Sequence, residues 1–133
     1  MTTSCKRILV VDDAATVRMY HRQIVEEAGY TVDVAINGIE ALEKALTHPF
    51  DLYLVDINMP KLDGYGFLRE LRASDITQSP AIMISTEAER SDLLRAYEAG
   101  ANHFLVKPTK PAQLIRICQL LLGTTGGPDE SAT

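Results

Sequence analysis

Short apolar runs alternate with amphipathic segments along this chain. Four continuous runs are typical of strands buried on both faces, at residues 7–11, 50–55, 81–84 and 104–106, and residues 31–36 alternate loosely, as in a strand nearer the sheet edge. Apolar residues at helical spacing occupy 14–28, 39–46, 67–71, 89–99 and 111–121. Five strands alternating with five helices predict an α/β protein with a doubly wound parallel sheet and right-handed crossovers.

The apolar stripes also predict which helical side chains face the sheet. They comprise Val17, Tyr20, Ile24 and Ala28, then Ile39, Leu42 and Leu46, then Leu93, Leu94 and Tyr97, and finally Leu114, Cys118 and Leu121. Tyr65 is expected to pack in the core, whereas His21 is expected to be exposed. Pro111 is expected in the first turn of the last helix.

Length and composition set bounds on the class of protein. A chain of 133 residues is long enough for one domain with a core, expected at residues 1–122, and the small polar residues 123–133 are expected to form a disordered tail or linker. The net charge of −5 argues against nucleic acid or an anionic membrane as partner. Without a secretory signal or a membrane-length apolar run, the expected location is the cytoplasm. Cys5 and Cys118 lack the spacing of a metal site.

Chemically active residues follow four of the five predicted strands. They are Asp12 and Asp13, Asp56, Ser85 with Thr86, and Lys107. Because parallel strands bring their carboxyl ends to one sheet edge, these groups are expected to meet there. Each one alone is equally well explained as a cap of a turn or helix, but the four together favour a shared site.

Clustered carboxylates repel one another unless a cation joins them. Mg²⁺ suits such a set because it takes one or two protein carboxylates and keeps several waters. A lysine and a hydroxyl can bind the oxygens of a phosphoryl group, and an aspartate can itself accept that group as an acyl phosphate. The strand ends therefore predict a Mg²⁺-dependent phosphoryl site.

Five motifs carry a family resemblance. They are Val-Asp-Asp at 11–13, Asp-Ile-Asn-Met-Pro-Lys-Leu-Asp-Gly at 56–64, Ser85, Glu-Ala-Gly-Ala at 98–101 and Val-Lys-Pro at 106–108. Together they make the chain similar to the CheY-like receiver domains of two-component response regulators, over roughly residues 6 to 122. The resemblance implies a flavodoxin-like fold with strand order 2-1-3-4-5. It also implies a phosphoacceptor that assists its own phosphorylation and dephosphorylation, rather than an enzyme.

The resemblance also implies roles for individual residues. Asp56 would accept the phosphoryl group from a phosphohistidine on a sensor histidine kinase. Asp13, Asp56 and the backbone carbonyl of Asn58 would bind Mg²⁺ directly, and Asp12 would act largely through water. Lys107 would pair with Asp56 at rest and with the phosphoryl oxygens afterwards.

After phosphorylation Ser85 would move toward the phosphoryl group, and Phe104 would rotate inward into the vacated space. The output face would be the fourth helix, fifth strand and fifth helix, where a target protein binds, with the chain a monomer or a phosphorylation-dependent dimer. The peptide bond between Lys107 and Pro108 is often cis in this family.

Some positions depart from the family pattern. Ser85 stands where threonine is commoner, and Phe104 replaces a frequent tyrosine. Thr86 is larger than the usual residue and is expected to narrow the approach of water, so that Thr86→Ala would speed loss of the phosphoryl group. Asn58 and Glu87 form the pair that, by the same resemblance, accompanies rapid self-dephosphorylation.

Other functions use parts of the same pattern. An aspartyl phosphatase usually has a second aspartate two residues after its nucleophile, where this chain has Asn58. A docking module without phosphorylation would not need the acidic, hydroxyl and lysine set. A phosphate relay or sink uses the same site without a target. The favoured hypothesis is a single-domain response regulator, and the resemblance alone suggests chemotaxis or another motility process.

Overall fold

Helices and strands alternate along the whole described chain. The structure is a computed structural model, and it describes residues 6–86 and 90–123. The elements are β1 (Arg7–Val11), α1 (Ala15–Glu27), β2 (Thr31–Ala35), α2 (Gly38–Thr47), β3 (Leu52–Asp56), α3 (Gly64–Ala73), β4 (Ala81–Ser85), α4 (Arg90–Ala99), β5 (His103–Val106) and α5 (Pro111–Leu122). Each predicted strand and helix is therefore present. Cys5, Glu87 and residues 124–133 lie outside the described ranges.

The strands form one parallel sheet in the order β2-β1-β3-β4-β5. This order confirms the flavodoxin-like prediction and places β2 at an edge, as its looser pattern indicated. In the register of the sheet, Val11 lies beside Val55, and Asp56 lies beside Ile84. The residues that follow the strands consequently gather at a single edge.

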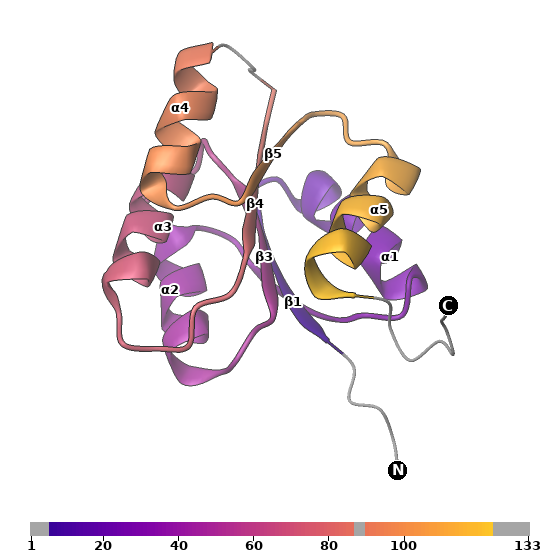
Figure 1. Ribbon diagram of the computed structural model, residues 1–133, viewed down its shortest axis with the longest axis horizontal. Helices are drawn as coiled ribbons and strands as arrows, with labels where there is room; N and C mark the ends of the chain where they lie inside the picture. The colour runs from indigo at the N-terminus through magenta and orange to yellow at the C-terminus, as the bar shows by residue number, and fades with distance from the viewer. Residues whose placement is uncertain (1–5, 87–89, 124–133) are drawn as a thin grey trace.

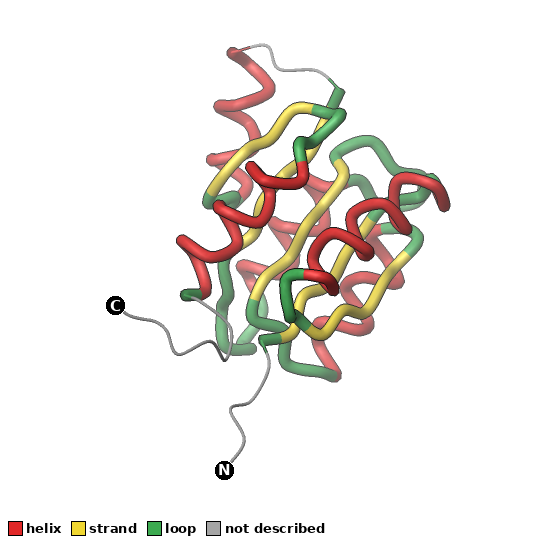
Figure 2. The backbone as a smooth tube through the Cα atoms, turned by 90° about the vertical axis from the view of Figure 1, so that its right-hand side faces the viewer, coloured by secondary structure: helices red, strands yellow, loops and turns green. Residues whose placement is uncertain are grey.

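Helices cover both faces of the sheet. Figure 1 shows α2, α3 and α4 on one side and α1 and α5 on the other, and Figure 2 shows the same layers from the side of α1 and α5. Successive strand residues alternate between the two cores: Tyr53 and Val55 pack with the first group of helices, and Leu52 and Leu54 with the second. Burial on both faces explains why these runs are continuously apolar.

In two helices only part of the predicted apolar stripe faces the core. Leu42 of α2 and Leu93 of α4 pack against it as predicted, and the other predicted side chains do not. In α2 the buried side chains are Ala41 and Ala45, whereas Ile39 and Leu46 are 44% and 48% exposed. In α4, likewise, the alanines 96 and 99 are buried, and Leu94 and Tyr97 are exposed. Small side chains allow a helix to pack closely against its neighbours, and here this outweighs the larger apolar stripe.

The stripe of α1 is predicted correctly in part: Ile24 is buried and Ala28 packs against the core. His21, Ile24 and Val25 are its buried residues, whereas Tyr20 is 40% exposed. The prediction that His21 is exposed is wrong, because its side chain has a buried hydrogen-bond partner.

The packing predictions for α5 and α3 agree with the structure. In α5, Pro111 is the first residue and Leu114 and Cys118 are buried, and in α3 Tyr65 is buried as expected. None of the helices in residues 6–86 and 90–123 has the length and apolar character needed to cross a bilayer.

Candidate metal centre

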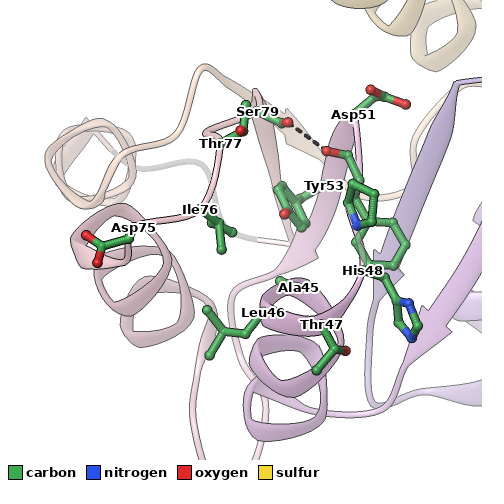
Figure 3. A pocket seen from close by; sticks show the side chains of 12 residues that line it. Ala45, Leu46, Thr47, His48, Asp51, Tyr53, Asp75, Ile76, Thr77 and Ser79 are labelled. Carbon is green, nitrogen blue, oxygen red and sulfur yellow. Dashed lines mark hydrogen bonds between the residues drawn. The ribbon is translucent and has the colours of Figure 1, made fainter.

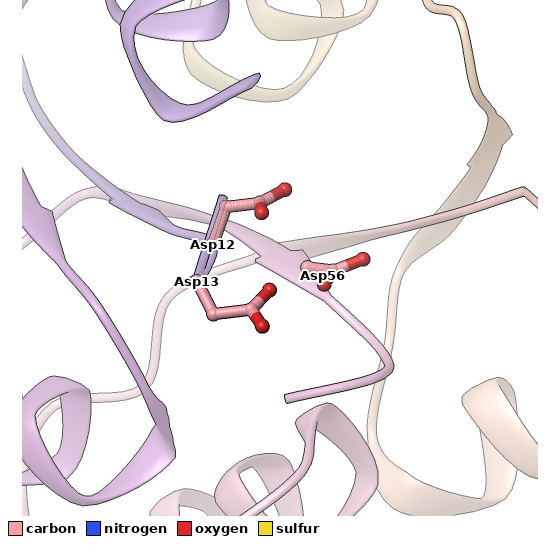
Figure 4. Close-up of side chains that lie close together, drawn as sticks. All are labelled: Asp12, Asp13 and Asp56. Carbon is pink, nitrogen blue, oxygen red and sulfur yellow. The ribbon is translucent and has the colours of Figure 1, made fainter. Parts of the chain in front are cut away.

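Three carboxyl groups meet at the carboxyl edge of the sheet. Asp12 and Asp13 follow β1, and Asp56 ends β3, the central strand. Each offers an oxygen that lies within 4.8 Å of the others. Figure 4 shows the three side chains pointing in the same general direction. Asp12 and Asp56 are buried and Asp13 is exposed, so the cluster is open to solvent on one side.

Lys107 reaches this cluster from the end of β5. Its Nζ atom lies 2.9 Å from Oδ1 of Asp56 and 3.0 Å from Oδ2 of Asp12. The pairing with Asp56 was predicted, and the pairing with Asp12 was not. Because β1 lies directly beside β3, a lysine long enough to cross β4 can bridge both carboxylates.

The charges of the cluster do not balance. Burial raises the pKa of Asp56 to about 6, a rise that the Lys107 hydrogen bond opposes and the neighbouring Asp12 and Asp13 reinforce. Burial works to lower the pKa of Lys107, but its bonds to Asp56 and Asp12 outweigh this and raise it. One ammonium group faces three carboxyl groups. The cluster therefore has the oxygen donors and the surplus negative charge that a divalent cation requires.

The loop after β3 is folded closely against Asp56. The N–H of Gly64 donates to the carbonyl oxygen of Ile57 at 2.8 Å, and a Cβ atom at Gly64 would lie only 2.5 Å from the carbonyl oxygen of Asp56. Lys61 turns the loop with a φ of 72°. Asp63 caps α3 by accepting a hydrogen bond from the N–H of Gly66 at 2.8 Å. This geometry holds the backbone of Asp56 in place.

The other predicted site residues lie around the same edge. Ser85 is buried at the end of β4, and Thr86 and Asn58 are exposed. Phe104 is already packed in the core with 8% exposed, and its movement on phosphorylation stays a prediction. The peptide bond between Lys107 and Pro108 is cis.

A buried histidine near the site was missed by the sequence reasoning. The Nε2 atom of His21 forms a hydrogen bond with Oγ1 of Thr109 at 2.9 Å, and both residues are 2% exposed. They line a groove of about 580 Å³ together with Lys107, Pro108 and Tyr20. The signal that could have found His21 is its helical spacing from Ile24 and Val25, which places all three on one face.

The burial of His21 predicts an acid-sensitive contribution to stability. Burial lowers its pKa from 6.5 to about 4, so the unfolded chain binds a proton more readily than the folded one between these values. This contribution is fully present above pH 6.5 and is lost as the pH falls to about 4. The loss amounts to about 3 kcal/mol in the free energy of unfolding.

The His21→Leu variant is expected not to show this acid-dependent fall in the free energy of unfolding. The measurement is urea unfolding of both chains in EDTA from pH 7 down to pH 4. The difference between the chains isolates His21, because Asp56 and the other acids titrate in both. Parallel pH profiles for the two chains would contradict the assignment.

A second hollow lies at the opposite edge of the sheet. Its volume is about 510 Å³, and it is lined by the segments that precede β3 and β4. Figure 3 shows its side chains, with Tyr53 between the two segments and Oγ of Ser79 donating to the carbonyl oxygen of Phe50 at 2.6 Å. The aspartate cluster and Lys107 do not line this hollow. Among the residues that the structure describes, the candidate chemistry therefore lies at the carboxyl edge.

Comparisons with known proteins agree with this geometry. Residues 8–119 match the family described as the response regulator receiver domain. The chain belongs to this receiver domain family of two-component systems. Such domains are phosphoacceptors that interact with sensor histidine kinases, bind Mg²⁺ at an acidic pocket and are generally not classed as enzymes.

The relatives differ in length. The chain is 37% identical over 120 residues to the transcriptional regulatory protein ResD of Bacillus subtilis, covering 90% of this chain and 49% of ResD. It is 43% identical over 103 residues to the chemotaxis protein CheY of the same organism, covering 77% of this chain and 85% of CheY. The chain thus spans about half the length of ResD and of similar transcriptional regulators.

A solved structure matches the same fold. The receiver domain of the sensor histidine kinase PA1611 from Pseudomonas aeruginosa PAO1 has a TM-score of 0.84 and 33% identity, over 91% of this chain and all of that one. That structure holds a magnesium ion coordinated in its active site cleft.

Proposed function

We propose that Asp56 of this chain accepts a phosphoryl group from the phosphohistidine of a sensor histidine kinase. The observation that supports this most is the contact of Lys107 Nζ with both Asp56 and Asp12, with Asp13 at the same point. Asp56 stands at the end of a buried central strand, and so a rigid base holds it. A carboxylate in that position, next to a fixed positive charge, is suited to attack phosphorus.

In the proposed step, an oxygen of the Asp56 carboxylate attacks the phosphorus atom as the P–N bond of the phosphohistidine breaks. The imidazole leaves with the electron pair of that bond, and Asp56 becomes an acyl phosphate. Lys107 is close enough to neutralise the charge on the phosphoryl oxygens. Ser85 ends the strand beside Asp56 and is proposed to donate a hydrogen bond to the same oxygens.

Magnesium fits the acidic cluster on the chemistry of its donors. Asp13 and Asp56, with the backbone carbonyl of Asn58, are proposed as direct ligands. Asp12 is proposed to act largely through water, and its Oδ1 atom already accepts a hydrogen bond from the N–H of Ala14 at 2.9 Å. When bound, Mg²⁺ supplies positive charge that stabilises the equatorial phosphoryl oxygens.

The signal is proposed to leave through α4, β5 and α5. Phosphorylation adds about −1.5 to −2 of charge and three acceptor oxygens at the sheet edge. Ser85 ends β4 and Lys107 directly follows β5, so both are next to that face. Its exposed apolar side chains, Leu94, Tyr97 and Val106, offer a contact surface for a target protein. Phe104 belongs to the same buried cluster as the alanines of α4 and is proposed to change its packing as the equilibrium between two arrangements shifts.

The lifetime of the phosphoryl group is proposed to depend on Thr86, Asn58 and Glu87. Thr86 is exposed and lines the groove next to Lys107, where its methyl group narrows the approach of water. The receiver unit is proposed to comprise residues 1–122.

The test of this function is labelling by acetyl phosphate with and without Mg²⁺. We expect one equivalent of base-labile phosphoryl group per chain with Mg²⁺ and loss of labelling in EDTA, because the repulsion among the carboxylates and the phosphoryl oxygens is then unscreened. Labelling that does not depend on the metal would contradict the proposal. Saturating turnover of a phosphomonoester would instead support the aspartyl phosphatase.

A further inference from the structure

The segment that carries Lys107 into the cluster is held at both of its ends. At its start, the N–H of Lys107 donates to the carbonyl oxygen of Ser85 at 2.7 Å. Two residues later, Thr109 is held by neighbouring residues of α1. The hydroxyl of Tyr20 donates to the carbonyl oxygen of Thr109 at 2.7 Å, and His21 bonds to the Thr109 hydroxyl at 2.9 Å.

These two contacts on Thr109 form a tie between α1 and the segment between β5 and α5. The His21 bond is almost fully buried, so neither partner can exchange it for a bond to water. The rings of Tyr20 and His21 pack against each other with their centroids 5.5 Å apart, which restricts both side chains. The pKa of about 4 leaves His21 neutral at pH 7, so the bond is between uncharged groups.

We propose that Tyr20 and His21 are positioning residues that hold Thr109 so that the Lys107 ammonium stays between Asp12 and Asp56. This inference rests on the proposed phosphoacceptor function for its effect on rate, and on the observed ion pairs alone for its effect on metal binding. Lys107 is the group that acts on the phosphoryl oxygens, and the tie acts through it.

Loss of the tie is expected to have two opposite effects. A less restrained Lys107 spends less time between the carboxylates, so phosphorylation slows. The same change leaves the acidic cluster more negative, so Mg²⁺ binds more tightly. If the tie had a merely structural role, its loss would loosen the pocket, and Mg²⁺ would then bind more weakly, not more tightly.

The experiment compares Thr109→Val with Thr109→Ser. Valine has nearly the shape of threonine but no hydroxyl, whereas serine keeps the hydroxyl that His21 contacts. Two quantities are measured: the Mg²⁺ affinity, by calorimetry, and the initial rate of labelling with acetyl phosphate. Since one hydrogen bond is lost, Thr109→Val is expected to bind Mg²⁺ about two- to tenfold more tightly and to be labelled slower by a similar factor. Thr109→Ser is expected to restore both values.

Tyr20→Phe tests the second contact, and Tyr30→Phe is its matched control. The hydroxyl of Tyr30 also donates to a backbone carbonyl, that of Gly123. Tyr30 directly precedes β2, so it lies at the amino edge of the sheet, opposite the acidic cluster. Tyr20→Phe is expected to change both readouts in the same directions as Thr109→Val, and Tyr30→Phe to change neither. In a Lys107→Ala background, Thr109→Val is expected to have no further effect on Mg²⁺ affinity.

Wild-type Mg²⁺ affinity in both Thr109→Val and Tyr20→Phe would overturn the proposal. Weaker Mg²⁺ binding in Thr109→Val would do so too, as would an effect that persists without Lys107. These results are independent of phosphorylation. If instead the wild-type chain is not labelled at all, the proposed function fails, and the calorimetry still decides whether the tie positions Lys107.

Discussion

Asp56→Asn is expected to reduce labelling by acetyl phosphate in Mg²⁺ to background. The variant keeps the size of the side chain but replaces the nucleophilic carboxylate by a neutral amide, which cannot form an acyl phosphate. The fall in labelling is expected to be complete because the other two carboxylates, Asp12 and Asp13, follow β1 and do not take the place of Asp56 at the end of β3. The measurement is the phosphoryl content per chain after a fixed time.

The controls separate chemistry from folding. Burial raises the pKa of Asp56, which means that holding its charge inside the protein is costly, so Asp56→Asn is expected to unfold in urea at the same or a higher midpoint in EDTA. Asp75→Asn changes an exposed carboxylate outside the cluster and is expected to be labelled like the wild type. Undiminished labelling of a folded Asp56→Asn chain would rule Asp56 out as the acceptor.

Gly64→Ala is expected to lower the free energy of unfolding by about 3 kcal/mol. The added Cβ would lie 2.5 Å from the carbonyl oxygen of Asp56 and 3.0 Å from the Cα atom of Ile57. Both are backbone atoms, so the loop after β3 has to move away from the strand. Because that movement displaces Asp56 itself, labelling is expected to slow as well. Urea unfolding and the initial labelling rate measure the two effects.

Gly66→Ala is the matched control for this substitution. It lies on the same turn of α3, but its Cβ would meet chiefly the end of the flexible Leu62 side chain, at 2.6 Å. Rotation of that side chain relieves the contact, and alanine also favours the helix, so a change of less than about 1 kcal/mol is expected. Equal destabilisation by the two substitutions would show that the close approach of Gly64 to β3 does not support the site.

The site could be predicted from the sequence because parallel strands collect their carboxyl ends. Asp12, Asp13, Asp56 and Lys107 are remote in sequence, yet each directly ends or follows a buried apolar run. The predicted strand order places the ends of these strands near one another, so the four side chains are expected to lie close together. Four of the five strands were recognisable because burial on both faces leaves mostly apolar residues in them, and β2, at the edge, was recognised from its looser alternation.

Packing between helices was harder to predict. In α2 and α4 the alanines are the buried residues and most of the larger apolar residues of the predicted stripes are exposed, although Leu42 and Leu93 pack against the core. Close approach of helix and sheet favours small side chains, whereas a pattern of hydrophobicity gives the larger ones more weight. His21 was predicted to be exposed because the sequence does not reveal which residue could satisfy its hydrogen bonds inside the core. Its partner, Thr109, lies 88 residues away, and only the packing of α1 against the segment before α5 brings the two together.

The position of the phosphoryl group tests the central claim most directly. The chain is labelled with acetyl phosphate and Mg²⁺, and the acyl phosphate is reduced with borohydride, which leaves free carboxylates unchanged. Mass-spectrometric peptide mapping then locates the reduced residue. The account predicts a single reduced position, Asp56. A phosphoryl group on a histidine, serine or threonine, or on any other carboxylate, would contradict it.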